Sequence, residues 1–310
     1  MTGIGGIIYG LVQIGHLLHD ATYIAYAKRL MSSIETKHVE EDCLFDIIFG
    51  SAGLLLALLS LYKACPEDQV LELARCCGKH LRKQAKDVGK GAVSWGDSPC
   101  LGFSHGNAGI AYALGSLLPF DSSEDLLGTI KKALAFERRH YSPENKNWPR
   151  LPNDFACGWC HGATGIGMGR LLLSSLLQDP EVDREIQLAY ETTRANMFTG
   201  RCNLCCGLLG RMEFIREINR EPLEPFYQSI LLQLKTKTAS HRSRFHAGDG
   251  GDRLFSPSHG GQSALLATSF TLYEWRGPKS KFVTECGIPL PPGDLQSPWW
   301  LEAKSTMETM

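Results

Sequence analysis

The chain has 310 residues, of which 43% are hydrophobic and 21% charged. This length is enough for one large domain with a single core, and the composition is not that of a disordered chain. Because the formal net charge is only −1, there is no general electrostatic reason to expect nucleic acid or an anionic membrane as a partner.

The 11 cysteines are an odd number in a chain too long to need disulfide staples. This favours free thiols in the reducing cytoplasm. Residues 1–18 are apolar, but they contain five glycines and no basic segment at their start. We therefore expect a buried helix there, and neither a membrane span nor a cleavable export signal.

Pairs of glycines recur roughly every 50 residues, which indicates an internal repeat. They lie within residues 3–6, 50–53, 106–109, 162–165 and 207–210, with a weaker copy near Gly260. An apolar stretch with helical periodicity follows each pair, at residues 7–18, 54–62, 110–118, 166–177 and, in more polar form, 212–218. Amphipathic stretches with a charged face lie between the pairs, at 67–86, 122–140 and 181–196.

The predicted repeating unit is therefore a helix hairpin with a charged outer helix and an apolar inner helix. No stretch shows the sustained alternation of a strand. Hairpins of this size cannot bury their apolar faces alone, and closing them into a ring buries every inner helix. The sequence thus predicts an all-α fold, a ring of repeated helix hairpins over residues 1–276. Residues 277–310, rich in Pro and Gly, are expected to form an irregular tail.

In such a ring the glycine pairs lie at the same end of the inner helices. The polar residues just before them would then gather at one mouth of the barrel: Asp46, His105, Cys160, His161, Cys205 and Cys206. Three thiolates favour zinc and leave a fourth tetrahedral position open, which is typical of a catalytic site. A substrate thiol is the expected ligand of that position, and a water to be ionised is the alternative.

Four segments of the chain resemble motifs of the lanthionine synthetase C-like (LanC-like) cyclases. They are residues 45–53 (FDIIFGSAG), 102–110 (GFSHGNAGI), 159–165 (WCHGATG) and 205–207 (CCG). The resemblance implies an α/α toroid that closes thioether rings in a dehydrated precursor peptide with free cysteines. The peptide thiol is added to dehydroalanine or dehydrobutyrine, and a dehydratase domain or protein is implied as a further partner.

The resemblance also implies roles for the residues at the mouth. Cys160, Cys205 and Cys206 are the expected Zn²⁺ ligands, and the adjacent cysteine pair is similar to that in cyclase domains of LanM-type synthetases. His105 is the expected acid/base residue, with Asp46 as its catalytic or orienting partner. A histidine suits this role because it titrates near neutral pH and can protonate the enolate that forms on the peptide. His161 is a candidate substrate-binding residue.

Both ends depart from the family pattern. The glycines at 3–6 resemble the second repeat of the family ring, and the last copy, at residues 258–266, is degenerate. We therefore expect a ring that is incomplete at its first and last repeats.

Three alternatives remain open. One is a LanC-like protein that adds glutathione, and another is a truncated zinc-dependent scaffold that binds peptides without turnover. The third is a carbohydrate-active α/α barrel, which would need paired carboxylates where the mouth offers only Asp46.

Overall fold

The computed structural model describes residues 3–97, 100–121, 123–200 and 203–219. Its helices are α1 (Gly3–Leu18), α2 (Ala21–Met31), α3 (Thr36–Glu40), α4 (Ser51–Ala64), α5 (Asp68–Gln84), α6 (Asn107–Leu117), α7 (Glu124–Arg138), α8 (Ala163–Leu177), α9 (Pro180–Ala195) and α10 (Leu208–Asn219). A short 3-10 helix, η1 (Leu118–Phe120), follows α6. The two strands β1 (Lys86–Asp87) and β2 (Val93–Ser94) pair antiparallel. The described chain is thus largely helical, as predicted.

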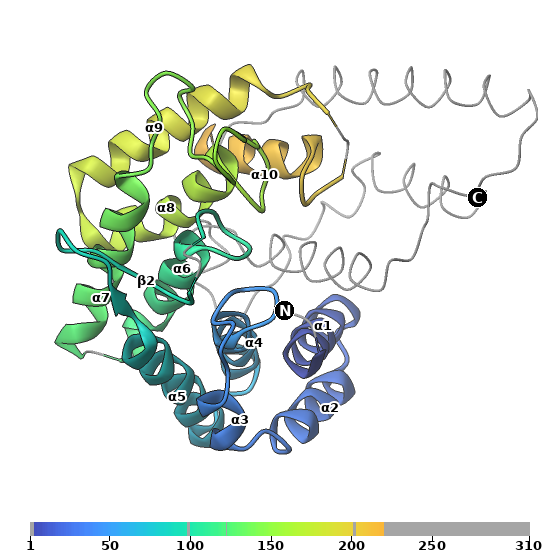
Figure 1. Ribbon diagram of the computed structural model, residues 1–310. Helices are drawn as coiled ribbons and strands as arrows, with labels where there is room; N and C mark the ends of the chain where they lie inside the picture. Colours follow the sequence, from blue (N-terminus) through green and yellow to red (C-terminus); the bar gives the residue numbers. More distant parts are fainter. Residues whose placement is uncertain (1–2, 98–99, 122, 201–202, 220–310) are drawn as a thin grey trace, which may run out of the picture. The chain divides into compact units, whose positions relative to one another are not determined.

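The helices form consecutive hairpins around a row of inner helices. Helices α1, α4, α6, α8 and α10 each contact the next one in this order. The outer helices α2, α5, α7 and α9 pack on α1, α4, α6 and α8 respectively, and Figure 1 shows α5, α7 and α9 outside their partners. Each predicted inner and outer stretch coincides with one of these helices to within a few residues.

The sequence explains which helix lies inside. In α4, the buried residues include five consecutive positions, 57–61, so that every face of the helix is covered. In α5, the buried residues recur three or four positions apart, as at Val70, Ala74, Cys77 and Leu81, and form one stripe on an otherwise charged helix. One hydrophobic core joins side chains from all five inner helices.

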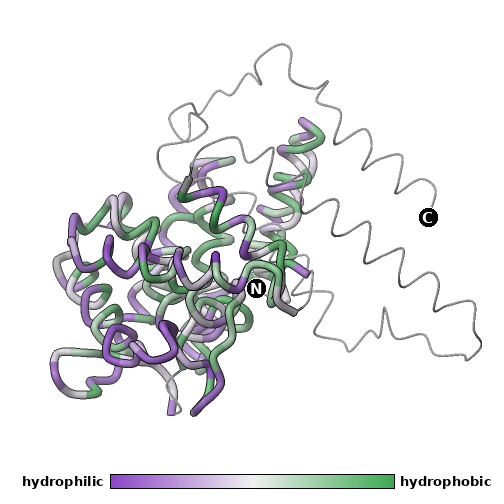
Figure 2. Tube along the Cα trace, turned by 90° about the horizontal axis from the view of Figure 1, so that it is seen from above, coloured by the Kyte–Doolittle hydropathy of each residue, from purple (hydrophilic) through white to green (hydrophobic). Residues whose placement is uncertain are grey.

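Small residues let neighbouring inner helices approach closely. A Cβ atom added to Gly115 in α6 would lie only 2.5 Å from Cδ2 of Leu173 in α8. Figure 2 shows hydrophobic and hydrophilic stretches interleaved through the described chain. Among the described helices, none is both long enough and apolar enough to cross a bilayer.

Several features lie beyond the sequence predictions or beyond the described residues. Helix α2 was not predicted, although Asp20 accepts a hydrogen bond from Thr22 N at 2.9 Å and caps its start. The repeat copy near Gly260, the domain boundary at 276 and the tail at 277–310 lie outside the described residues. The expected gap in the ring therefore stays a prediction.

Candidate active site

The loops before α4, α6, α8 and α10 fold back onto the first turn of the helix that follows. Helices α4, α6 and α8 begin one residue after Gly50, Gly106 and Gly162, the first glycines of their pairs. The second glycine of the pair contacts the loop before α6, α8 and α10. A Cβ atom added to Gly109 would lie 1.9 Å from Phe103 O. A Cβ atom added to Gly165 would lie 2.1 Å from Trp159 O, and one added to Gly210 would lie 2.2 Å from Leu204 O. A side chain does not fit there, which explains why a glycine recurs at this place in the repeat.

Backbone hydrogen bonds join these loops into one rim, formed by residues 45–50, 101–106, 157–162 and 203–207. Ile47 N donates to Ser104 O at 3.2 Å, and Ser104 N donates to Cys160 O at 3.1 Å. Cys160 N in turn donates to Cys205 O at 3.2 Å. Residues far apart in the sequence are thereby fixed side by side, in the order of the repeats.

The residue just before each first glycine adds one side chain to this rim. These residues are Phe49, His105, His161 and Cys206. The ring centroids of Phe49 and His105 are 5.8 Å apart, and those of His105 and His161 are 6.0 Å apart. Three aromatic rings therefore follow one another along the rim toward the cysteines.

Three cysteine sulfurs meet on the rim. The Sγ atoms of Cys160, Cys205 and Cys206 all lie within 4.8 Å of one another. Cys160 is buried, Cys205 is half-buried and Cys206 is exposed, so the group can be reached from outside. Contact with the sulfurs of Cys205 and Cys206, together with burial, raises the pKa of Cys160. Sulfur donors at this spacing, coming from two repeats, could hold a soft metal ion such as zinc.

His105 and Asp46 form a hydrogen-bonded pair on the same rim. His105 Nδ1 lies 2.7 Å from Asp46 Oδ2. The carboxylate of Asp46 is buried, and its Oδ1 accepts a hydrogen bond from Phe49 N at 2.6 Å. Because a carboxylate accepts, Nδ1 of His105 carries the hydrogen, and Nε2 is the nitrogen that can take up or release a proton.

His161 directly follows Cys160 in the chain, and its ring is the neighbour of the His105 ring. Its Nδ1 is 3.3 Å from Leu101 O, which can only accept, so Nδ1 donates. Burial lowers the pKa of His161. A neutral ring with its lone pair on Nε2 can accept a hydrogen bond from a bound molecule.

Residues outside the motifs hold the ends of the rim loops. Asp42 Oδ2 accepts from Phe45 N at 3.2 Å and from Ser51 N at 2.7 Å, and so closes the first loop. Asn147 Oδ1 accepts from Ala163 N at 2.8 Å and so helps to hold the start of α8. No sequence motif indicated either role.

The loop that carries His105 is closed by Glu137, a buried residue of the outer helix α7. Its Oε1 accepts from Gly102 N and from Ala108 N, each at 3.0 Å. In the sequence, Glu137 is one of many charges on an amphipathic helix, so no local signal marks it.

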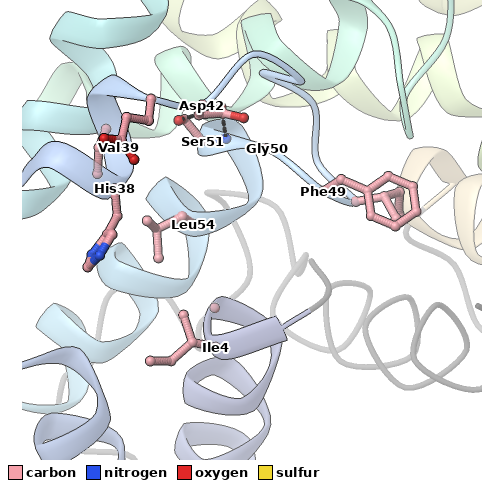
Figure 3. A pocket seen from close by; sticks show the side chains of 11 residues that line it. Ile4, His38, Val39, Asp42, Phe49, Gly50, Ser51 and Leu54 are labelled. Carbon is pink, nitrogen blue, oxygen red and sulfur yellow. Dashed lines mark hydrogen bonds between the residues drawn. The ribbon is translucent and has the colours of Figure 1, made fainter. Parts of the chain in front are cut away.

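A hollow of about 280 Å³ lies beside the Asp46 loop. It is lined by residues of α1, α3, the loop before α4 and α4 itself (Figure 3). The Asp42 carboxylate in this hollow also accepts a hydrogen bond from Ser51 Oγ at 2.6 Å, drawn in Figure 3. Its Oδ2 is thus used to hold the start of α4.

The consecutive helix hairpins define an α/α toroid. The model of the family described as lanthionine synthetase C-like protein matches residues 1–256. The chain therefore belongs to the lanthionine synthetase C-like family, as the motifs predicted.

Among solved structures, nisin cyclase matches with a TM-score of 0.62 and 16% identity, over 88% of this chain and 79% of nisin cyclase. At this identity the likeness shows the fold alone. The GH76A alpha-1,6-mannanase from Salegentibacter sp. HEL1_6 matches with a TM-score of 0.48 and 18% identity, over 64% of this chain and 60% of that one, which is too weak to carry an argument. No curated protein sequence matches the chain.

Proposed function

We propose that this chain is a zinc-dependent lanthipeptide cyclase. It adds a cysteine thiol of a dehydrated precursor peptide to dehydroalanine or dehydrobutyrine and so forms a lanthionine or methyllanthionine ring. The observation that carries the proposal is the convergence of three cysteine sulfurs within 4.8 Å. The His105–Asp46 pair on the same rim and the membership of the LanC-like family support it.

Cys160, Cys205 and Cys206 would hold the zinc ion. Their sulfurs are soft donors, and three of them leave one tetrahedral position for a further ligand. Zinc held by these residues would lower the pKa of a substrate thiol, so that the thiol would be a nucleophilic thiolate at neutral pH. The exposed side of the group, at Cys206, is where the peptide thiol enters.

His105 and Asp46 handle the proton of the reaction. As the bond forms between the peptide sulfur and the β-carbon, the alkene electrons move to the α-carbon and its carbonyl as an enolate. His105 takes up the proton of the peptide thiol at Nε2 and then donates it to the α-carbon, while Asp46 holds the opposite nitrogen and the orientation of the ring. Overall, S–H is added across C=C, so no further reactant is consumed.

His161 would bind the substrate between these two groups, since its ring lies 6.0 Å from that of His105 and its residue adjoins Cys160. The peptide must arrive already dehydrated. We therefore propose a dehydratase domain or protein as the partner that supplies it.

The test is incubation of the purified protein, with zinc, with a peptide that contains one dehydroalanine and one free cysteine. Cyclisation leaves the mass unchanged, so the remaining thiols are alkylated and counted by mass spectrometry. We expect the peptide to lose its alkylatable thiol when it is incubated with the wild-type protein. With Cys206→Ala the peptide should keep this thiol. Cys157→Ser is the matched control, because Cys157 lies in the same loop as Cys160 but its sulfur contacts Thr164 Oγ1 at 3.4 Å.

The same assay separates the cyclase from a glutathione-adding protein and from a peptide-binding scaffold. If glutathione is included and the peptide gains the mass of glutathione, the chain is a glutathione-adding LanC-like protein. If the peptide binds but keeps its thiol under every condition, the chain is a binding scaffold. Either result contradicts the cyclase proposal.

A further inference from the structure

Glu137 closes the His105 loop from another layer of the fold. It lies on the outer helix α7, and its side chain is fully buried. One carboxylate oxygen, Oε1, accepts from Gly102 N and Ala108 N, which lie on either side of His105. A single atom thus sets the distance between the start of the loop and the first turn of α6.

The loop held in this way also holds its neighbours. Ser104 O accepts from Ile47 N of the Asp46 loop, and Phe103 N and Ser104 N both donate to Cys160 O. A change in the span of the His105 loop would therefore alter the approach of His105 to Asp46. Asp42 and Asn147, which hold the two adjacent loops, come from connecting segments and not from an outer helix.

The second oxygen of Glu137 belongs to a buried ion cluster. Glu137 Oε2 lies 3.1 Å from Arg170 Nη1, and Arg170 Nε lies 2.7 Å from Glu185 Oε2. Glu185 Oε1 lies 2.7 Å from Arg138 Nε. Burial raises the pKa of Glu137, while Arg170 and the two N–H donors oppose that rise. The cluster ties α7 to α8 and α9.

We propose that Glu137 is a positioning residue for His105 in the proposed cyclase reaction. By accepting both N–H donors it fixes the loop that presents the imidazole to Asp46 and to the substrate. It does not touch the substrate itself. The inference about the reaction rests on the proposed function, whereas the effect on the His105 ring can be observed without it.

The test compares Glu137→Ala, Glu137→Gln and Glu185→Gln in the zinc-loaded full chain. Glu137→Ala removes the acceptor of both N–H groups, whereas Glu137→Gln keeps one oxygen that can serve both. Glu185→Gln is the matched control, because it removes the same charge from the same cluster but leaves the His105 loop untouched. The readouts are kcat and KM with the dehydrated peptide, zinc content, and the ¹⁵N signals of His105 in histidine-labelled protein.

We expect Glu137→Ala to lower kcat roughly 10-fold to 100-fold with little change in KM, because catalysis is sensitive to misplacement on the scale of 1 Å. Its zinc content should stay at the wild-type value and its His105 signals should move. Glu137→Gln should recover most of the activity, and Glu185→Gln should match the wild type in kcat and in the His105 signals. Should Glu137→Ala fail to fold, Glu137→Asp takes its place. The aspartate side chain is one methylene shorter, so its carboxylate lies farther from the two N–H groups of the loop.

Two results would overturn the inference. One is a Glu137→Ala protein whose His105 signals coincide with those of the wild type. The other is a Glu185→Gln protein that shows the same shifts as Glu137→Ala, because the cluster as a whole would then be responsible. If the wild-type chain closes no ring, the proposed function fails, and the His105 signals still decide the role of Glu137.

Discussion

Nδ1 of His105 and Oδ2 of Asp46 lie 2.7 Å apart although 59 positions separate the two residues in the sequence. The repeat brings them together, because each sits in the loop before an inner helix and neighbouring loops are joined by the hydrogen bond from Ile47 N to Ser104 O. The pair therefore depends on the toroid and could not form within one hairpin.

Replacing His105 separates proton transfer from metal binding. We expect His105→Ala to slow ring closure by about 10² to 10⁴-fold, the usual contribution of a positioned general acid or base. The zinc content should stay unchanged, because the sulfurs do not depend on this side chain. Asp46→Asn should also slow the reaction, by a smaller factor. Single-turnover cyclisation and metal analysis measure both effects, and a His105→Ala rate within twofold of wild type would remove His105 from the mechanism.

Replacing a cysteine of the group should remove the metal. We expect Cys160→Ala and Cys206→Ala to lower bound zinc toward zero, since each takes away one of the three sulfurs that lie within 4.8 Å. Cys157→Ser should retain zinc in full. Metal analysis of the purified variants by mass spectrometry checks this. Full zinc in both alanine variants would show that the metal, if bound, lies elsewhere.

Zinc binding should release protons. The pKa of Cys160 is raised by the neighbouring sulfurs and by burial, so this thiol is protonated at pH 7 before the metal binds. A metal binds only the thiolate, and its affinity should therefore fall as the pH falls. Calorimetry of zinc binding in buffers of different ionisation enthalpy measures the number of protons released. An enthalpy that is the same in every buffer would contradict the ligand assignment.

The second glycines of the pairs at residues 106–109, 162–165 and 207–210 should tolerate no side chain. Gly109→Ala would place a Cβ atom 1.9 Å from Phe103 O, so the loop or helix α6 must shift. We expect a loss of about 1–3 kcal/mol in the free energy of unfolding, the usual cost of overpacking. Gly128→Ala is the control: it lies within α7 with no atom within 4 Å of the added Cβ, and it should stabilise the chain by roughly 0.5–1 kcal/mol. Equal unfolding curves for the two variants would refute the packing role of Gly109.

Much of this fold could be predicted because its signals are local and repeated. The glycine pairs predicted where α4, α6, α8 and α10 begin, since a glycine is needed wherever a loop folds back onto a helix. Helix α2 was overlooked because no glycine pair introduces it, although Asp20 is a cap of the expected type. The strands β1 and β2 span two residues each, which is too short for an alternating pattern.

The sequence predicted that the candidate residues lie together, but it predicted only part of their contacts, and their roles in the reaction stay predictions. The sequence analysis selected Asp46, His105, Cys160 and the Cys205–Cys206 pair because each lies just before a glycine pair. In the structure each of these residues lies on the rim. Glu137 was not foreseen. It lies 35 and 29 positions from the two N–H groups that it binds, and only the packing of α7 on α6 brings them together.

The most direct test of the central claim is the zinc X-ray absorption spectrum with and without the dehydrated peptide. Three protein thiolates and an open position predict a shell of three sulfurs at about 2.3 Å and one lighter ligand at about 2.0–2.1 Å. Addition of a peptide with a free cysteine should replace the lighter ligand by a fourth sulfur. Four sulfurs in the protein alone would indicate a closed structural site, and an unchanged shell after peptide addition would show that the substrate thiol does not enter the metal site.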